Sequence, residues 1–322
     1  MMIILVIICF TPPVTAENSY SITDVSKYDF EAHISNIHIH TDLTAESEPD
    51  LKKAEENLRD AGWRMRFHKK NHDVKESVFQ NELQQSDLHI HAGHGFNLPV
   101  IGGHIELSKY IIPSIAQGKG GWVSANEVKE AWKTKSPKLW TAIHSCHVLE
   151  TDQQWAEVLK NTRMHGILGF GSTAYATDHS LTDFTEAATK QHKPIAEAWE
   201  YASLKNHLST DNEPVKVRTI FKNIDQYKND KLDKPSTNTK NEIVVCDVPL
   251  SSDIVGKDQI KGWCKPLNSD KLFKFIYDIT YSPSDPETIV SAKKTYINAN
   301  SQIIVDTNTT YNKHTTRKKI DL

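Results

Sequence analysis

The stretch LHIHAGHG, residues 88–95, decides the fold, because it is an apolar strand that ends in glycine and histidine. A second stretch of the same design, LWTAIHSC, occupies residues 139–146. In a sheet of parallel strands, reactive groups gather in the crevice at the carboxyl ends of the strands. We therefore expect His94 and Cys146 to lie at one edge of such a sheet, as a base and a thiol between which a proton can move.

Helical patterns lie between and after these strands. The sequence SEPD at 47–50 supplies an N-cap, a first-turn proline and an early acid, and it predicts a helix over 48–61. The sequence SANE at 124–127 is a capping box that opens a helix reaching Trp132. The other elements of this region are strands at 34–40 and 167–170, a helix marked by Trp155, Val158 and Leu159, and one or two helices within 184–208. The alternation predicts an α/β fold with a mostly parallel sheet and helices on both faces.

Composition changes towards the C-terminus. Residues 225–240 are rich in Lys, Asp, Asn, Ser and Thr with few apolar side chains, which predicts an exposed linker. Residues 241–322 contain β-branched and aromatic runs and predict a small all-β domain. Its expected strands lie at 243–246, 273–281, 288–297 and 302–305. The α/β domain would then span residues 17–224.

The N-terminus has the pattern of a secretory signal. An apolar run, Ile3 to Phe10, is followed by Val14 and Ala16 at the two positions that signal peptidase selects. We expect residues 1–16 to be a signal peptide and the mature protein to be secreted or held in the cell envelope. The apolar run is too short to span a bilayer, so no membrane association is expected after cleavage.

Cysteine usage agrees with export. Signal cleavage would remove Cys9 and leave three cysteines. Cys246 and Cys264 lie close in sequence and are expected to form a disulfide in an oxidising compartment. Cys146 is then the odd thiol, either reactive or buried in the core.

Charge restricts the partners. The formal net charge of -3 and a pI near 6.6 show no basic excess, so nucleic acid is not an expected partner. Locally, Glu150 and Asp152 follow Cys146 closely. They either favour a pocket for basic side chains or form the acidic start of a helix.

The pairs His-Gly at 94–95 and Ser-Cys at 145–146 resemble the caspase-like cysteine peptidases (clan CD), which include caspases, legumains, gingipains and clostripain. Members of that group have one hydrophobic strand ending in His-Gly and another ending in a small residue and Cys. The separation of 52 residues fits the roughly 50 of the caspase pattern. The resemblance covers about residues 34–205, and the ILGF at 167–170 looks like a prokaryotic caspase- or gingipain-like branch.

This resemblance implies a cysteine endopeptidase that acts on a peptide or protein without a cofactor or metal. Cys146 would attack the scissile carbonyl, and His94 would protonate the departing amine. The backbone amides of Gly95 and Cys146 would bind the oxyanion. Caspases have Gln-Ala-Cys where this chain has His-Ser-Cys at 144–146, so their substrate pocket is not transferred.

Other interpretations stay open. The HIH at 38–40 and the HIH at 89–91 each place two histidines on one face of a strand, as a metal-dependent hydrolase would need. His144 and His147 flank Cys146 and together could bind zinc. The non-enzyme alternative is a catalytically inactive caspase-like binding module of the cell envelope.

Overall fold

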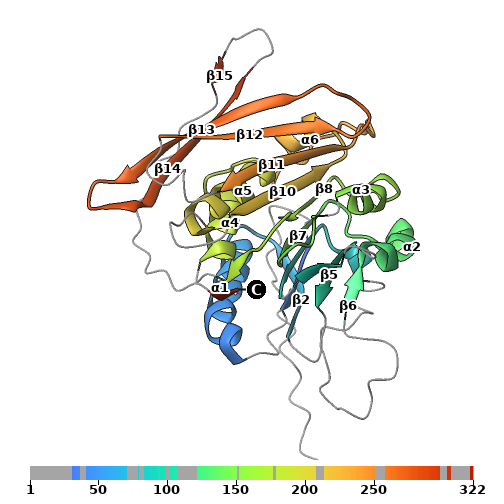
Figure 1. Ribbon diagram of the computed structural model, residues 1–322. Helices are drawn as coiled ribbons and strands as arrows, with labels where there is room; N and C mark the ends of the chain where they lie inside the picture. Colours follow the sequence, from blue (N-terminus) through green and yellow to red (C-terminus); the bar gives the residue numbers. More distant parts are fainter. Residues whose placement is uncertain are drawn as a thin grey trace, which may run out of the picture.

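The protein is described by a computed structural model (Figure 1). It describes residues 31–36, 41–70, 79, 83–93, 95–98, 102–106, 122–150, 152–176, 179–207, 214–250, 258–297, 303–305 and 320–321. The expected signal peptide, 1–16, and His94 lie outside this part of the chain.

One sheet of eleven strands dominates the described residues, in the order β15-β14-β13-β12-β11-β10-β8-β7-β3-β1-β2. Its parallel half consists of β1 (Glu31–Asn36), β2 (Arg64–Lys70), β3 (Leu88–Ala92), β7 (Trp140–His144) and β8 (Gly166–Phe170). Its antiparallel half consists of β10 (Val215–Phe221), β11 (Val244–Leu250), β12 (Gln259–Pro266), β13 (Phe273–Ser282), β14 (Asp285–Ile297) and β15 (Ile303–Val305). The α/β class is therefore confirmed, and the sheet extends beyond the expected parallel strands into an antiparallel half, so that it is mostly antiparallel as a whole.

Helices cover both faces of the parallel half, as expected (Figure 1). On one face lie α1 (Thr41–Asp60), α4 (Ser180–Thr189) and α5 (Ile195–His207), and on the other α2 (Ala125–Lys135) and α3 (Asp152–Lys160). Each strand serves both faces, because successive side chains of a strand point to opposite sides. In β8, Leu168 packs in the core under α5, whereas Ile167 packs with Trp155 of α3.

The helix α1 is longer at its N-terminus than the sequence predicts. It begins at Thr41, and Pro49 lies inside it with an exposed side chain. Proline removes an amide hydrogen bond and its ring crowds the carbonyl of the preceding turn. The helix is still held against the core at this point, because Asp50 and Leu51 are buried. The region expected to be helical within 184–208 forms two helices, α4 and α5.

The sheet does not divide at the expected domain boundary. Helix α6 (Ile224–Asn229) occupies the start of the expected linker 225–240, and the segment after it folds back onto this helix, since Ser236 Oγ donates to Asp225 Oδ2 over 2.7 Å. β11 pairs directly with β10 along its whole length. The expected β-rich strands are present, but they extend the α/β sheet because β10 (Val215–Phe221) pairs with β8 on one side and with β11 on the other.

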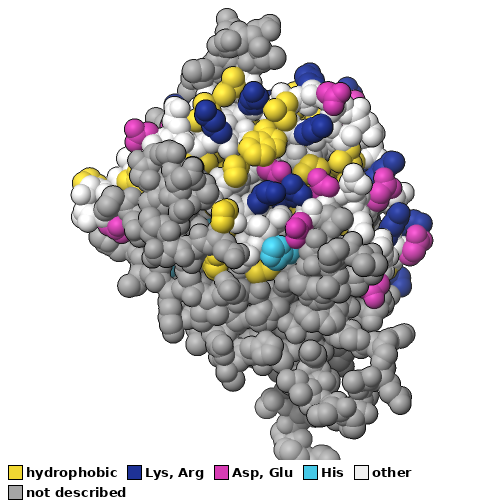
Figure 2. Space-filling view, viewed as in Figure 1, with side chains coloured by type: hydrophobic (Ala, Val, Ile, Leu, Met, Phe, Trp, Pro, Cys, Tyr) yellow, Lys and Arg dark blue, Asp and Glu magenta, His cyan; other side chains and the backbone are white. Residues whose placement is uncertain are grey.

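Helix α5 packs against β10, β11 and β14 on one face of the antiparallel half, and α3 packs against β10 on the other. β12 alternates buried and exposed residues, which is the pattern of a strand with one solvent-facing side. Figure 2 shows Lys and Arg side chains among hydrophobic ones over this half. The two fully buried cysteines Cys246 and Cys264 face each other on β11 and β12 and form the predicted disulfide, with an S–S distance of 2.12 Å.

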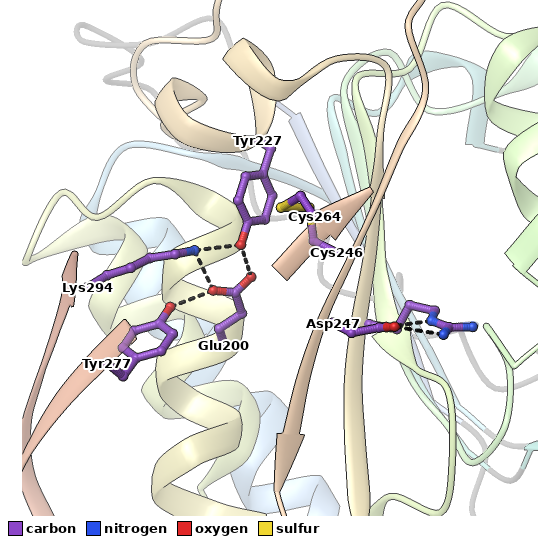
Figure 3. Close-up of a disulfide and its surroundings, with 8 residues drawn as sticks. Glu200, Tyr227, Cys246, Asp247, Cys264, Tyr277 and Lys294 are labelled. Carbon is purple, nitrogen blue, oxygen red and sulfur yellow. Dashed lines mark hydrogen bonds and ion pairs between the residues drawn. A yellow bond between two sulfur atoms is a disulfide. The ribbon is translucent and has the colours of Figure 1, made fainter. Parts of the chain in front are cut away.

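A buried ion pair attaches α5 to this half (Figure 3). Lys294 Nζ of β14 lies 2.6 Å from Glu200 Oε2 of α5, and both side chains are inaccessible to solvent. Tyr227 and Tyr277 donate their hydroxyls to the same carboxylate over 2.7 and 2.5 Å. Burial lowers the pKa of Lys294, while Glu200 counteracts this by favouring the charged amine.

Two small sheets lie beside the large one. β4 (Gly95–Leu98), β5 (Gly102–Glu106) and β6 (Trp122–Ser124) form an antiparallel sheet that begins where β3 ends. The two-residue strands β9 (Tyr175–Ala176) and β16 (Ile320–Asp321) pair with each other. A short 3-10 helix at Leu83–Gln85 precedes β3.

Candidate functional site

The strands β3 and β7 are in register at the carboxyl edge of the parallel half. Ala92 is the partner of His144, and Gly93 N donates to His144 O over 3.2 Å. Cys146 follows His144 by two residues, and His94 follows Ala92 by two residues. The register therefore brings both chain segments out of the sheet at the same point. Because His94 lies outside the described residues, its distance from Cys146 stays a prediction, as does the oxyanion role of Gly95 and Cys146.

The sulfur of Cys146 bonds to both backbone groups of one residue, Ala174. Ala174 N donates to Cys146 Sγ over 3.2 Å, and the thiol donates to Ala174 O over 3.2 Å. Cys146 is only 4% exposed. Because the thiol donates to Ala174 O, the sulfur carries its proton in this arrangement. Its burial also limits the access of a substrate to the sulfur.

The turn that carries Cys146 is fixed to the end of β8. His147 has a φ of 55°, in the left-handed region, and its amide donates to Ser172 O over 2.7 Å. Leu149 N donates to Phe170 O over 2.9 Å. Gly169 permits this close approach, since a Cβ there would lie 3.0 Å from a methyl group of Val148.

Arg218 of β10 holds the same turn from the antiparallel half. Its guanidinium makes two hydrogen bonds to Asp247 of β11, of 2.6 and 2.9 Å. A further N–H donates to the carbonyls of Leu149 and Glu150, each over 3.1 Å. A bidentate pair of this kind fixes the guanidinium plane, so the carbonyls after Cys146 have rigid donors.

Behind the sheet edge lies a buried histidine pair. His144 Nε2 is 3.4 Å from His207 Nε2, and burial lowers the pKa of His144 to about 3. His144 is therefore neutral at physiological pH and cannot supply a positive charge to a thiolate. Tyr175 N donates to His207 Nδ1 over 3.4 Å, so the proton of a neutral His207 is on Nε2. His207 thereby attaches the start of β9 to α5.

The carboxylates after Cys146 have partners within the chain. Glu150 Oε2 lies 2.8 Å from His147 Nδ1, and Asp152 Oδ2 lies 3.7 Å from Arg218 Nη1. Asp152 is in the first turn of α3, as the helix-start interpretation expects. A preference for basic substrate side chains stays a prediction.

The histidines considered for metal binding are placed differently. His89 and His91 are fully buried, their rings 5.2 and 5.1 Å from that of Phe79, and His89 Nδ1 lies 3.0 Å from Thr141 Oγ1. The 38–40 stretch lies outside the described residues. Across the part of the chain that the structure describes, no group of three or more His, Cys, Asp or Glu residues is arranged to hold a metal ion. Nor does any described helix have the length and apolarity to cross a bilayer.

Three residues at this site were not found from the sequence: Ala174, His207 and Arg218. Ala174 acts through its backbone, which leaves no trace in residue type. His207 ends a helix and Arg218 lies in a strand, far from Cys146 in sequence. The alternation VKVRTIF at 215–221 could have revealed the strand, but not what its arginine binds.

The fold and site define an α/β protein with a cysteine at the carboxyl edge of parallel strands, followed by a turn that Arg218 of the neighbouring antiparallel strand holds in place. Residues 33–265 match the family model described as a domain of unknown function (DUF6345), and the chain belongs to this family. The family match crosses the expected linker at 225–240. No curated protein matches the chain.

Two solved structures are similar to it. One is a secreted C11 cysteine protease from Bacteroides thetaiotaomicron in complex with an irreversible peptide inhibitor, at 14% identity and a TM-score of 0.38. That match covers 60% of this chain and 66% of the protease, just under two thirds of its length. The other is the Drosophila initiator caspase Dronc, at 10% identity and a TM-score of 0.35, covering 54% of this chain and 70% of the caspase.

Proposed function

We propose that this protein is an exported cysteine endopeptidase in which Cys146 is the nucleophile and His94 is its proton-transfer partner. The observation that carries the proposal is the register of β3 and β7. Ala92 pairs with His144, and the two proposed catalytic residues follow that pair at equal distances along their chains. Parallel strands in register deliver consecutive residues to the same crevice.

The proposed reaction has two stages. His94 takes the proton of the Cys146 thiol, the thiolate attacks the carbonyl carbon of a peptide bond, the C–N bond breaks, and the amine leaves with the proton from His94. Water then gives a proton to His94 and attacks the resulting thioester, the C–S bond breaks to release the acid, and His94 returns the proton to the sulfur. Backbone amides of Gly95 and Cys146 would bind the oxyanion in both stages, and one such donor contributes roughly 10²–10³-fold in rate.

Export is part of the proposal. The disulfide between Cys246 and Cys264 supports it, since disulfides persist in oxidising compartments. The signal pattern at 1–16 supports it independently. The expected partner is a peptide or protein substrate.

The test is covalent labelling of the protein beginning at residue 17 with a peptide that ends in an electrophilic ketone. We expect the label on Cys146, none in Cys146→Ala, and no effect of a chelator, which separates a thiol enzyme from a metal hydrolase. His94→Ala should lower peptide cleavage by about 10²-fold or more while lowering labelling less, since the thiol remains. His192→Ala is the control, because that histidine has a 60% exposed side chain paired with Asp233.

The second candidate is a catalytically inactive binding module, favoured by the burial of Cys146 and its bonds to Ala174. A structural thiol of this kind is inert. If Cys146 stays unlabelled in folded protein, and reporter peptides with Arg, Lys, Asn or Asp at the cleavage site stay intact, the peptidase proposal fails and the binding module replaces it.

A further inference from the structure

Two backbone groups bond to the sulfur of Cys146, and they belong to two successive peptide planes. Ala174 N, in the plane shared with Thr173, donates to Sγ, and Ala174 O, in the plane shared with Tyr175, accepts from the thiol. Both peptides are trans, so the other polar group of each plane points away from the sulfur. The contacts of these two outward groups therefore set how Ala174 N–H and Ala174 O face the sulfur.

The outward carbonyl of the first plane is held by Ser172. The hydroxyl of Ser172 donates to Thr173 O over 3.2 Å and accepts from Lys216 N of β10 over 2.6 Å. Ser172 is therefore fixed to the sheet, and through Thr173 O it keeps Ala174 N–H directed at the sulfur. An N–H that donates to the charged form of a group favours that form, so this contact stabilises a thiolate.

The outward amide of the second plane is held by His207, the last residue of α5. Tyr175 N donates to His207 Nδ1 over 3.4 Å. The Nε2 of the same ring lies 3.4 Å from both His144 Nε2 and Ser180 Oγ, and His207 is only 2% exposed. His207 thereby keeps Ala174 O directed at the sulfur, where a carbonyl accepts from the neutral thiol and repels a thiolate.

We propose that Ser172 and His207 are positioning residues with opposite effects on Cys146: Ser172 favours the thiolate through Ala174 N–H, and His207 favours the neutral thiol through Ala174 O. This inference rests on the proposed function for the role of the sulfur as nucleophile. In the resting protein both contacts are made, and the thiol keeps its proton. When His94 takes that proton, Ala174 O loses its donor, whereas Ala174 N–H still donates to the sulfur and stabilises the anion that attacks the substrate.

The experiment measures the pH at which the rate of alkylation of Cys146 by iodoacetamide is half-maximal, because the thiolate is the reacting form. In the chain beginning at residue 17, Cys146 is the one cysteine outside the disulfide. A change in access to the sulfur scales the rate equally at every pH and leaves this midpoint unchanged. The ultraviolet absorbance of the thiolate, measured against Cys146→Ser, gives the same midpoint without requiring access.

Ser172→Ala should raise the midpoint and His207→Phe should lower it, each by about 0.5–1 pH unit, the size expected for one hydrogen bond. Phe keeps an aromatic ring at this position, whose centroid in His207 lies 5.0 Å from that of Phe170, but it cannot accept from Tyr175 N. The matched controls are Ser172→Thr, which keeps the hydroxyl, and His207→Asn, whose side-chain oxygen can accept in place of Nδ1. Both controls should keep the midpoint of the unmodified chain.

The other ionisable side chains on the elements next to Cys146 are the same in every variant. They are His94 after β3, His144 on β7, His147 and Glu150 on the turn, Asp152 on α3, and Arg218 on β10. Their effects on the midpoint therefore cancel in the comparison.

Midpoints that stay the same, or that move in one direction in both variants, would overturn the inference, since a general loosening of the site has no reason to act with opposite signs. If either variant does not fold, the direction of the shift in the other decides the matter. Opposite shifts together with uncut reporter peptides would uphold the positioning roles while refuting the peptidase. Unchanged midpoints together with cut peptides would do the reverse.

Discussion

The parallel and antiparallel halves belong to one sheet but differ in what their residues do. The parallel half delivers Cys146 to its carboxyl edge and is buried on both faces, as the unbroken burial of β3 and β7 shows. The antiparallel half has a solvent-facing side, a disulfide and the pair of Glu200 and Lys294. The difference teaches that the proposed nucleophile and the contacts that stabilise the extension lie in different halves of the sheet, and Arg218 is one of the residues that connect them.

The largest effect on stability is expected at the ion pair. Lys294→Met should lower the free energy of unfolding by about 3–5 kcal/mol, because it leaves the carboxylate of Glu200 buried without a counter-charge. Urea unfolding measures this loss. Alkylation of Cys146 in the folded variant should keep its rate if the two halves are functionally separate.

The neighbouring Lys293→Met is the matched control, since Lys293 is only partly buried and should change stability by less than about 0.5 kcal/mol. Combining Lys294→Met with Glu200→Gln should recover part of the loss by removing the uncompensated charge. Equal unfolding free energies for the two lysine variants would show that the pair does not hold the extension.

The disulfide should have the next largest effect. Replacing both Cys246 and Cys264 by Ala should cost about 3 kcal/mol, because the bond closes a loop of 18 residues in the unfolded chain. Unfolding in urea without reductant measures the loss, and a reductant should reproduce it in the unmodified protein. If neither the double substitution nor the reductant changes the urea midpoint of unfolding, the disulfide does not stabilise the antiparallel half.

A pH dependence is expected in the parallel half. Asp50 of α1 accepts from Leu181 N and Thr182 N at the start of α4, over 2.9 and 2.7 Å, and burial raises its pKa from 3.8 to about 7. The folded state thus favours the protonated carboxyl. Its stabilising contribution is complete below about pH 4 and is lost as the pH rises towards 7, by at most about 1.4 kcal/mol per pH unit.

Asp50→Asn should therefore flatten the unfolding free energy between pH 4 and 7 relative to the unmodified protein. His144 is present in both proteins, so its contribution to the pH dependence of stability cancels in the comparison. Its lowered pKa acts in the opposite sense and makes the fold less stable as the pH falls from 6.5 towards 3. Parallel slopes for the two proteins would contradict the prediction.

The sequence by itself determined the local elements and their order. LHIHA at 88–92 and the strand before Cys146 were located to within a residue, because runs of buried apolar residues and their capping signals are local. The disulfide followed from three cysteines remaining after the expected cleavage, two of them near each other. The family resemblance rested on two short motifs at strand ends.

Tertiary structure alone decided how far the sheet extends and what surrounds the thiol. Composition at 225–240 suggested a boundary, but β10 and β11 pair across it, because backbone hydrogen bonding between strands is independent of the polarity of the segment that connects them. The contacts of Cys146 with Ala174, and of β9 with β16, are made by backbone atoms of residues distant in the chain. Such contacts depend on register and direction, and no residue type encodes either.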